Sequence, residues 1–147
     1  MHYVTDLHLH SKYSRAVSPQ MTLPVMAEHA AQKGLDILTA SDFTHPAWFK
    51  EMQIHLKESE YDGMYVLKDQ NAKLKTQKDI LFLLSTEISS IYKQDGKLRR
   101  IHNLIFVPNL AVAEKLNDTL ISKGCNLNAD GRPIIGLSSR DLLELIL

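Results

Sequence analysis

The chain has 147 residues, of which 44% are hydrophobic and 23% charged, a composition typical of a globular protein with one core. Seventeen basic residues balance seventeen acidic ones, so any anionic partner must be attracted by a local patch or by bound metal ions. The single Cys125 excludes an intramolecular disulfide and two-cysteine zinc signatures, and it predicts a cytoplasmic location. No apolar run approaches the roughly 18–20 residues of a membrane span. We therefore expect one domain over residues 1–147 and no membrane partner.

The first part of the chain predicts a strand–helix–strand unit. Apolar alternation indicates a strand over residues 3–9. An amphipathic helix is expected over 22–34, with Thr22 as its N-cap and Gly34 at its C-terminal stop. The apolar run 36–41 is typical of a parallel strand that is covered on both faces.

The rest of the chain continues this alternation of helices and strands. We expect a helix over 46–60 and then a short strand near 64–67, in the polar, lysine-rich stretch 61–78. Strands over 79–87 and 99–108 follow, joined by a hairpin turn at Asp95-Gly96. A helix over 110–123 is expected with Asn109 as its cap, and a last helix begins near 140 with Ser138 or Ser139 as its cap. This order predicts a mainly parallel α/β fold. Because the last helix has no following strand, we expect the front portion of a larger barrel.

Ionisable side chains gather where the predicted strands end. They are Asp6, His8 and His10 on one face of the first strand, Asp42 and His45 at the end of the second, Glu87 at the end of strand 79–87, and His102 near the start of strand 99–108. In parallel α/β folds, the carboxyl ends of the strands form the face where ligands bind. Mixed imidazole and carboxylate ligands suit Zn²⁺, Mn²⁺ or Fe. The pattern therefore predicts a metal site, in which Asp6 would orient a ligand imidazole.

The same residues have simpler interpretations. A His-x-His pair on a surface strand is often two solvated imidazoles, and Glu87 could equally be a solvated strand end. His102 could be a core histidine bonded to backbone, and His29 and His55 are expected to be bystanders on helices. Other catalytic schemes are not indicated, because the sequence has no glycine-rich phosphate loop and no Gly-x-Ser-x-Gly elbow.

Two motifs carry a resemblance to a known family. The opening "DLHLHSKYS" resembles the first motif of the polymerase and histidinol phosphatase (PHP) superfamily of metal-dependent phosphoesterases, which implies that His8 and His10 are metal ligands. "ASDFTHPAW" departs from that superfamily's usual Thr-Asp-His and is similar to the endonuclease Q branch. Phe43 occupies the usual histidine position, so the resemblance gives the ligand role to Asp42, His45 or both.

Later motifs extend this resemblance over nearly the whole chain. "STEIS" is similar to the third motif, which implies that Glu87 bridges metal ions, and "RRIHNLIFVP" resembles the fourth, with His102 as a ligand. The implied fold is the N-terminal part of a distorted (β/α)7 PHP barrel, truncated before its last motifs. The remaining ligands would lie beyond Leu147, supplied by a missing C-terminal half or by self-association.

The resemblance implies a complete site with two or three divalent ions. We count Asp6, Asp42 and Glu87 as candidate catalytic acids, and the candidate metal ligands are His8, His10, Asp42, His45, Glu87 and His102. The implied activity is a DNA repair endonuclease that cleaves on the 5′ side of deaminated bases or abasic sites. A small-molecule phosphatase or phosphodiesterase of the same superfamily, and an inactive truncated module, are the alternatives.

Overall fold

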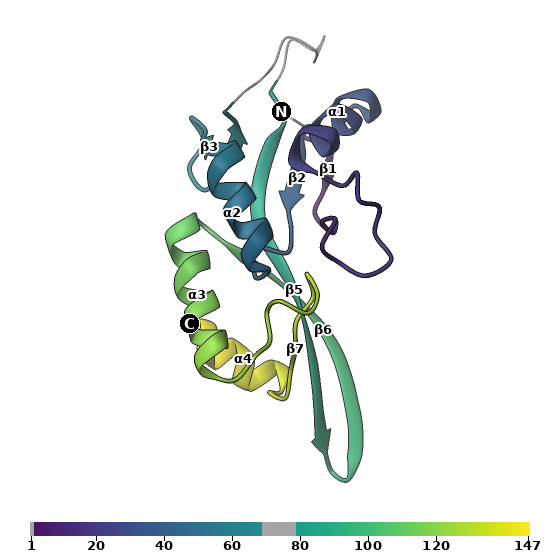
Figure 1. Cartoon of the computed structure of the whole chain (residues 1–147), viewed down its shortest axis with the longest axis vertical. Coiled ribbons are helices and arrows are strands. Elements are labelled where there is room, and N and C mark those ends of the chain that lie inside the picture. Colours follow the sequence, from purple (N-terminus) through teal and green to yellow (C-terminus); the bar gives the residue numbers. More distant parts are fainter. Residues whose placement is uncertain (1, 69–78) are drawn as a thin grey trace.

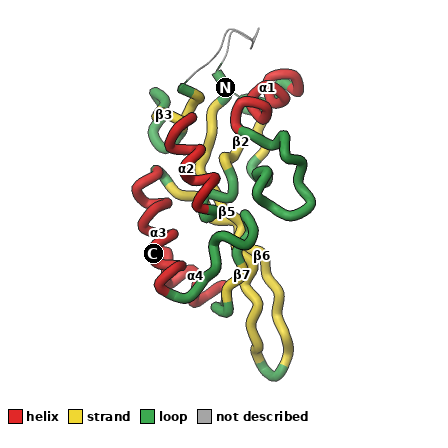
Figure 2. Tube along the Cα trace, viewed as in Figure 1, coloured by secondary structure: helices red, strands yellow, loops and turns green. Residues whose placement is uncertain are grey.

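The computed structural model describes residues 2–68 and 79–147, and within these ranges seven strands form one mixed sheet (Figures 1 and 2). In chain order the elements are β1 (Thr5–Asp6), α1 (Leu23–Lys33), β2 (Ile37–Ala40), α2 (Pro46–His55), β3 (Leu56–Glu58), β4 (Tyr65–Leu67), β5 (Leu81–Gln94), β6 (Lys97–Val107), α3 (Leu110–Ser122), β7 (Ile134–Ile135) and α4 (Ser139–Ile146). An α/β fold is therefore confirmed.

The central strand of the sheet is β5, which pairs with four others. The main path runs β1-β2-β5-β4-β3, and both β6 and β7 also pair with β5. The β1–β2, β2–β5 and β5–β7 pairings are parallel, whereas β3–β4, β4–β5 and β5–β6 are antiparallel. The expectation of a mainly parallel sheet was therefore wrong. Short connections account for two of the three antiparallel pairs, β3–β4 and β5–β6, because only antiparallel strands can be joined by a tight turn.

The core lies on one face of this sheet, beneath the helices. Side chains alternate along each strand, so Leu38, Phe82 and Leu84 face the main cluster, which also contains the fully buried Trp48 of α2 and Leu120 of α3. The opposite face carries a smaller cluster formed by Ile37, Val66 and Leu81. The sheet is thus apolar on both faces near its centre, as the unbroken burial of β2 indicates.

All four expected helices form, and capping residues mark where three of them begin. Thr22 takes the N-cap position of α1 without a side-chain hydrogen bond, whereas Asn109 accepts the Val112 N–H at the start of α3. Ser138 forms a capping box with Asp141 at the start of α4. None of the described helices is long and apolar enough to cross a bilayer.

Two predicted boundaries in the first half of the chain were wrong. The strand expected over 3–9 is confined to Thr5–Asp6, because only these residues pair with β2. The helix expected over 46–60 ends at His55, since residues 56–58 pair with β4 instead. The short strand expected near 64–67 forms as β4. The lysine-rich stretch 61–78 lies partly outside the described residues, which omit 69–78.

A long hairpin formed by β5 and β6 extends away from the rest of the molecule (Figure 1). Its turn residues Asp95 and Gly96 have φ angles of 51° and 71°, as a type I′ turn requires. This two-residue turn pairs Gln94 with Lys97 and so fixes the register of the whole ladder. The Asp-Gly hairpin prediction is confirmed, and β5 extends well beyond its predicted end.

Candidate metal centre

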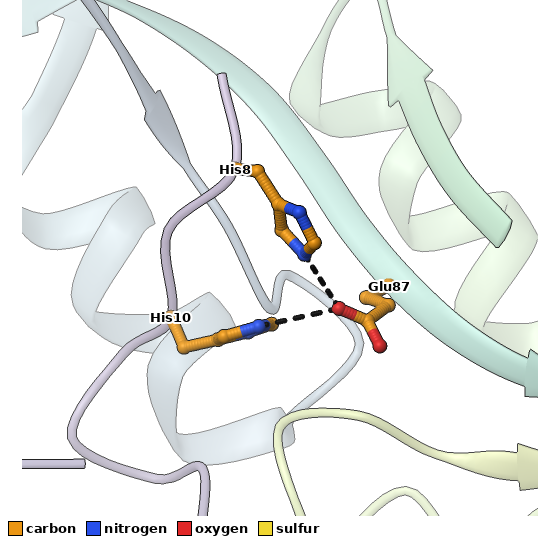
Figure 3. A group of neighbouring side chains, drawn as sticks. All are labelled: His8, His10 and Glu87. Carbon is orange, nitrogen blue, oxygen red and sulfur yellow. Dashed lines mark hydrogen bonds and ion pairs between the residues drawn. The ribbon is translucent and has the colours of Figure 1, made fainter. Parts of the chain in front are cut away.

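Glu87 lies at the centre of a group of three histidines. Its Oε2 atom is 2.6 Å from His8 Nε2 and 3.2 Å from His10 Nε2 (Figure 3). Its other oxygen, Oε1, contacts His102 Nδ1. The Glu87 side chain is only 4% exposed, whereas those of His8 and His102 are 56% and 60% exposed. The structure therefore brings together four of the residues that the sequence singled out, on a surface that solvent can reach.

His8 and His10 reach Glu87 because the first two strands, β1 and β2, are short. Strand β2 ends at Ala40, which pairs with Leu84, and β5 continues three residues further to Glu87. After β1 ends at Asp6, the chain leaves the sheet and brings His8 and His10 toward β5 (Figure 3). Glu87 was expected to end its strand, but it lies in the middle of β5. Because the neighbouring strand β2 ends at Ala40, the histidines can reach the Glu87 carboxylate.

The hairpin register places His102 beside Glu87. Glu87 pairs with Leu104 and Ser89 with His102, so Glu87 and His102 are diagonal neighbours on one face of the ladder. The alternative that His102 is a core histidine is excluded by its exposure and by its contact with a carboxylate.

Charge complementarity holds the group together. Burial alone would raise the pKa of the Glu87 carboxyl, but hydrogen bonds with His102 and His8 and the charge of His10 hold it below its usual range. The hydrogen bond with Asp42 raises the pKa of His10, against the opposing effect of burial. A buried carboxylate is costly unless it is paired, and the histidines supply that pairing here.

Asp42 contacts His10 on the side of the ring that faces away from Glu87. Its Oδ1 atom lies 3.0 Å from His10 Nδ1, on the side of the ring opposite the nitrogen that faces Glu87. Its Oδ2 atom accepts the Ser11 N–H at 2.6 Å and the Ser14 hydroxyl at 2.8 Å. The Asp42 backbone has a φ of 61°, a left-handed conformation that Asp tolerates better than most residues. Asp42 is fully buried, and its oxygens are occupied by these three donors.

A loop from the C-terminal part of the chain packs against this carboxylate. A Cβ atom on Gly131 would lie 2.6 Å from Asp42 Oδ2 and 2.3 Å from Ser14 Oγ. The Gly131 N–H donates to the Tyr13 carbonyl, and its own carbonyl accepts the Thr44 hydroxyl. Only glycine leaves room for this contact. Sequence reasoning missed Ser11, Ser14 and Gly131, although the first two lie in the opening motif that carries the family resemblance.

Two of the predicted site residues lie apart from Glu87. The His45 ring stacks on Tyr13 with centroids 4.3 Å apart, and burial lowers its pKa. Its Nδ1 atom is buried without a hydrogen-bond partner among the described residues. Asp6 accepts the backbone N–H of His8 and lines a cavity against α1, so the structure does not place it against a ligand imidazole. Asp42 has the contact that was expected of Asp6.

The donor set fits a divalent metal ion. His8, His10 and Glu87 each offer one ligand atom, and these atoms lie within 4.8 Å of one another. Two imidazoles and one carboxylate are a set that Zn²⁺, Mn²⁺ and Fe accept. Asp42 fixes the His10 ring through its other nitrogen, which is how ligand histidines are normally supported. The three-residue cluster could therefore hold a metal ion.

Two solved structures are similar to this chain. The chain matches the lesion-specific endonuclease PfuEndoQ from Pyrococcus furiosus with a TM-score of 0.77 and 30% identity, over 97% of this chain and 31% of that one. The chain resembles about a third of endonuclease Q. A second match, also with a TM-score of 0.77 and with 31% identity, is endonuclease Q in complex with a 27-mer duplex substrate that has an abasic lesion at its active site. It covers 97% of this chain and 32% of that one.

Comparison at the sequence level gives one curated relative. Protein MJ0043 from Methanocaldococcus jannaschii, which is uncharacterised, is 27% identical over 141 residues. The match covers 96% of this chain and 14% of that protein. No protein-family model matches the chain. The chain thus spans only a minor part of each protein that it matches, and a match to part of a longer endonuclease Q chain is consistent with a partial barrel.

Proposed function

We propose that this chain contributes the metal centre of a DNA repair endonuclease of the PHP superfamily. The observation that carries the proposal is the sharing of one buried carboxylate, Glu87, by His8, His10 and His102. The similarity to endonuclease Q supports the same function. By analogy with the lesion-specific enzyme, the proposed substrate is a duplex containing a deaminated base or an abasic site, cut on the 5′ side of the lesion.

The proposed ligands are His8, His10, Glu87 and His102. Glu87 is suited to bridging because its two oxygens face different histidines, Oε2 toward His8 and His10 and Oε1 toward His102. Divalent ions, two or three in a complete site, would supply Lewis acidity and screen the negative charge of a phosphodiester. The exposure of His8 and His102 leaves the group accessible to a large substrate.

Asp42 is proposed to orient His10 and to act through it. A carboxylate on the outer nitrogen of a ligand imidazole fixes its tautomer and increases its basicity. The Ser11 N–H and the Ser14 hydroxyl hold that carboxylate in place. The ligand roles of Asp42 and His45 and the imidazole-orienting role of Asp6 stay predictions, and the geometry gives none of these three residues a contact with Glu87.

Metal content and strand cleavage together test the proposal. The purified protein should contain Zn or Mn, and the double variant His8→Ala/His10→Ala should lose it. With Mn²⁺ or Zn²⁺ added, the protein should nick duplexes that contain uracil, hypoxanthine or an abasic site and leave an undamaged duplex intact. Equal metal content in the two proteins would contradict the site. Hydrolysis of a small phosphate ester without nicking of any duplex would favour a small-molecule phosphoesterase.

A further inference from the structure

The end of the β5–β6 hairpin is strongly basic, in a chain whose overall charge is zero. Between Tyr92 and Arg100 the sequence has four cations, Lys93, Lys97, Arg99 and Arg100, against the single acid Asp95. All four cations are exposed, and the salt bridges of the described residues leave each of them without an acidic partner. An unpaired cluster of this kind attracts polyanions locally.

These four cations divide between the two faces of the hairpin. Residues that pair directly across the ladder share a face, and alternate residues along a strand do so too. Because Ile91 pairs with Arg100 and Lys93 with Leu98, Arg100 and Lys93 lie on the face that carries Glu87 and His102. Because Tyr92 pairs with Arg99 and Gln94 with Lys97, those two cations lie on the opposite face.

The first of these faces leads directly outward from the candidate metal centre. Arg100 is two residues from His102 on the same face, a distance of about 7 Å along a strand. Lys93 is diagonal to Arg100, one step further toward the turn. The hairpin extends beyond the body of the molecule (Figure 1), so a long ligand lying across Glu87 could follow it.

We propose that this face of the hairpin, defined by Arg100 and Lys93, binds the phosphate backbone of the DNA that enters the metal centre. The proposal rests on the proposed function and names the surface that would hold its substrate outside the reacting phosphodiester. A two-stranded antiparallel ribbon is narrow enough to lie along a groove of duplex DNA. Arg and Lys contacts to phosphate position a duplex without reading its sequence, which suits recognition of a lesion rather than of a base sequence.

Two double variants test this surface, and each removes two exposed charges from the same hairpin. The test variant is Arg100→Ala/Lys93→Ala, and the matched control from the opposite face is Arg99→Ala/Lys97→Ala. Binding of a fluorescein-labelled, lesion-free DNA duplex is measured by anisotropy over a series of salt concentrations, with metal removed. The test variant should lower the slope of log K against log salt by about 2, one for each lost phosphate contact, and weaken binding about tenfold or more at low salt. The control should bind within about twofold of the wild type.

Each outcome decides the matter. Equal weakening by both doubles would show a diffuse basic field and overturn the assignment to one face. Unchanged binding in both, or no binding by the wild type, would overturn the assignment of this surface to DNA altogether. Nicking of an abasic duplex by the wild type is measured separately. If the wild type nicks the duplex and both double variants bind DNA as the wild type does, only the hairpin surface is contradicted. If binding depends on the face of the hairpin but the wild type nicks no lesion, only the proposed function is contradicted.

Discussion

Gly131 approaches the Asp42 carboxylate so closely that a Cβ atom would lie 2.6 Å from Oδ2 and 2.7 Å from Cγ. These residues are 89 positions apart in the sequence. Asp42 in turn contacts His10, and His10 contacts Glu87. A chain of direct contacts therefore connects a C-terminal loop to the candidate metal centre, and the packing of that loop sets the position of a proposed ligand.

Gly131→Ala should destabilise the protein and weaken its metal binding. The added methyl group must displace Asp42 or Ser14, and both are buried and hydrogen-bonded to each other. Overpacking of this kind costs about 1–3 kcal/mol. Denaturant unfolding and metal titration against a competing chelator measure the two effects.

Gly136→Ala is the matched control for that substitution. Gly136 lies in the same C-terminal part of the chain, and nothing is within 4 Å of the position its Cβ would take. Its stability and metal affinity should stay close to those of the wild type. If the Gly131 and Gly136 variants behave alike, the contact with Asp42 has no energetic importance.

Asp42→Asn should preserve the shape of the site and weaken metal binding about 10–100-fold, the usual cost of losing a supporting partner. The amide cannot accept from Ser11, Ser14 and His10 together, since one of its two terminal atoms is a donor. Nitrogen NMR shifts of the His10 ring in metal-free protein report its tautomer. An unchanged tautomer together with unchanged affinity would rule out the positioning role.

The contact between Glu87 and His102 could be anticipated from the sequence. An Asp-Gly turn between two apolar strands predicts a two-residue hairpin loop, and a loop at Asp95-Gly96 pairs Gln94 with Lys97. Counting back along both strands from that pair puts Ser89 opposite His102 and makes Glu87 its diagonal neighbour. A short-range signal therefore fixes this part of the site.

The roles of Asp6 and Asp42 could not be assigned in the same way. Period-two alternation put Asp6 on the same face as His8 and His10, but it holds only while the chain stays in a strand, and β1 ends at Asp6. Asp42 reaches His10 through a left-handed backbone and a loop from the other end of the chain. Such long-range packing leaves no periodic trace in the sequence.

Glu87→Gln should remove most of the bound metal and leave the fold intact. The substitution keeps the size of the side chain, but it removes the negative charge that His8, His10 and His102 share. Elemental analysis of the purified variant measures metal per chain. Glu114→Gln, which removes one exposed carboxylate from α3, is the control and should keep the wild-type metal content. Retention of metal by the Glu87 variant would exclude this carboxylate as a ligand.

In metal-free protein, His10 should make stability depend on pH. The hydrogen bond with Asp42 raises the pKa of His10 in the folded state, so the folded protein binds this proton more tightly than the unfolded chain does. The resulting stabilisation is fully present below the unfolded pKa of about 6.5 and is lost as the pH rises through the folded pKa. Unfolding free energies of the wild type and His10→Gln, measured with chelator from about pH 5.5 to 9, should therefore differ most at the acid end.

The same comparison in the Asp42→Asn background shows whether Asp42 is the cause. Without the carboxylate, the raised pKa of His10 loses its largest contribution. The difference in unfolding free energy between Asp42→Asn and the double variant Asp42→Asn/His10→Gln should therefore vary less with pH. A difference that is independent of pH in both backgrounds would show that the His10–Asp42 contact does not bias protonation, and its role would then be limited to orientation of the ring.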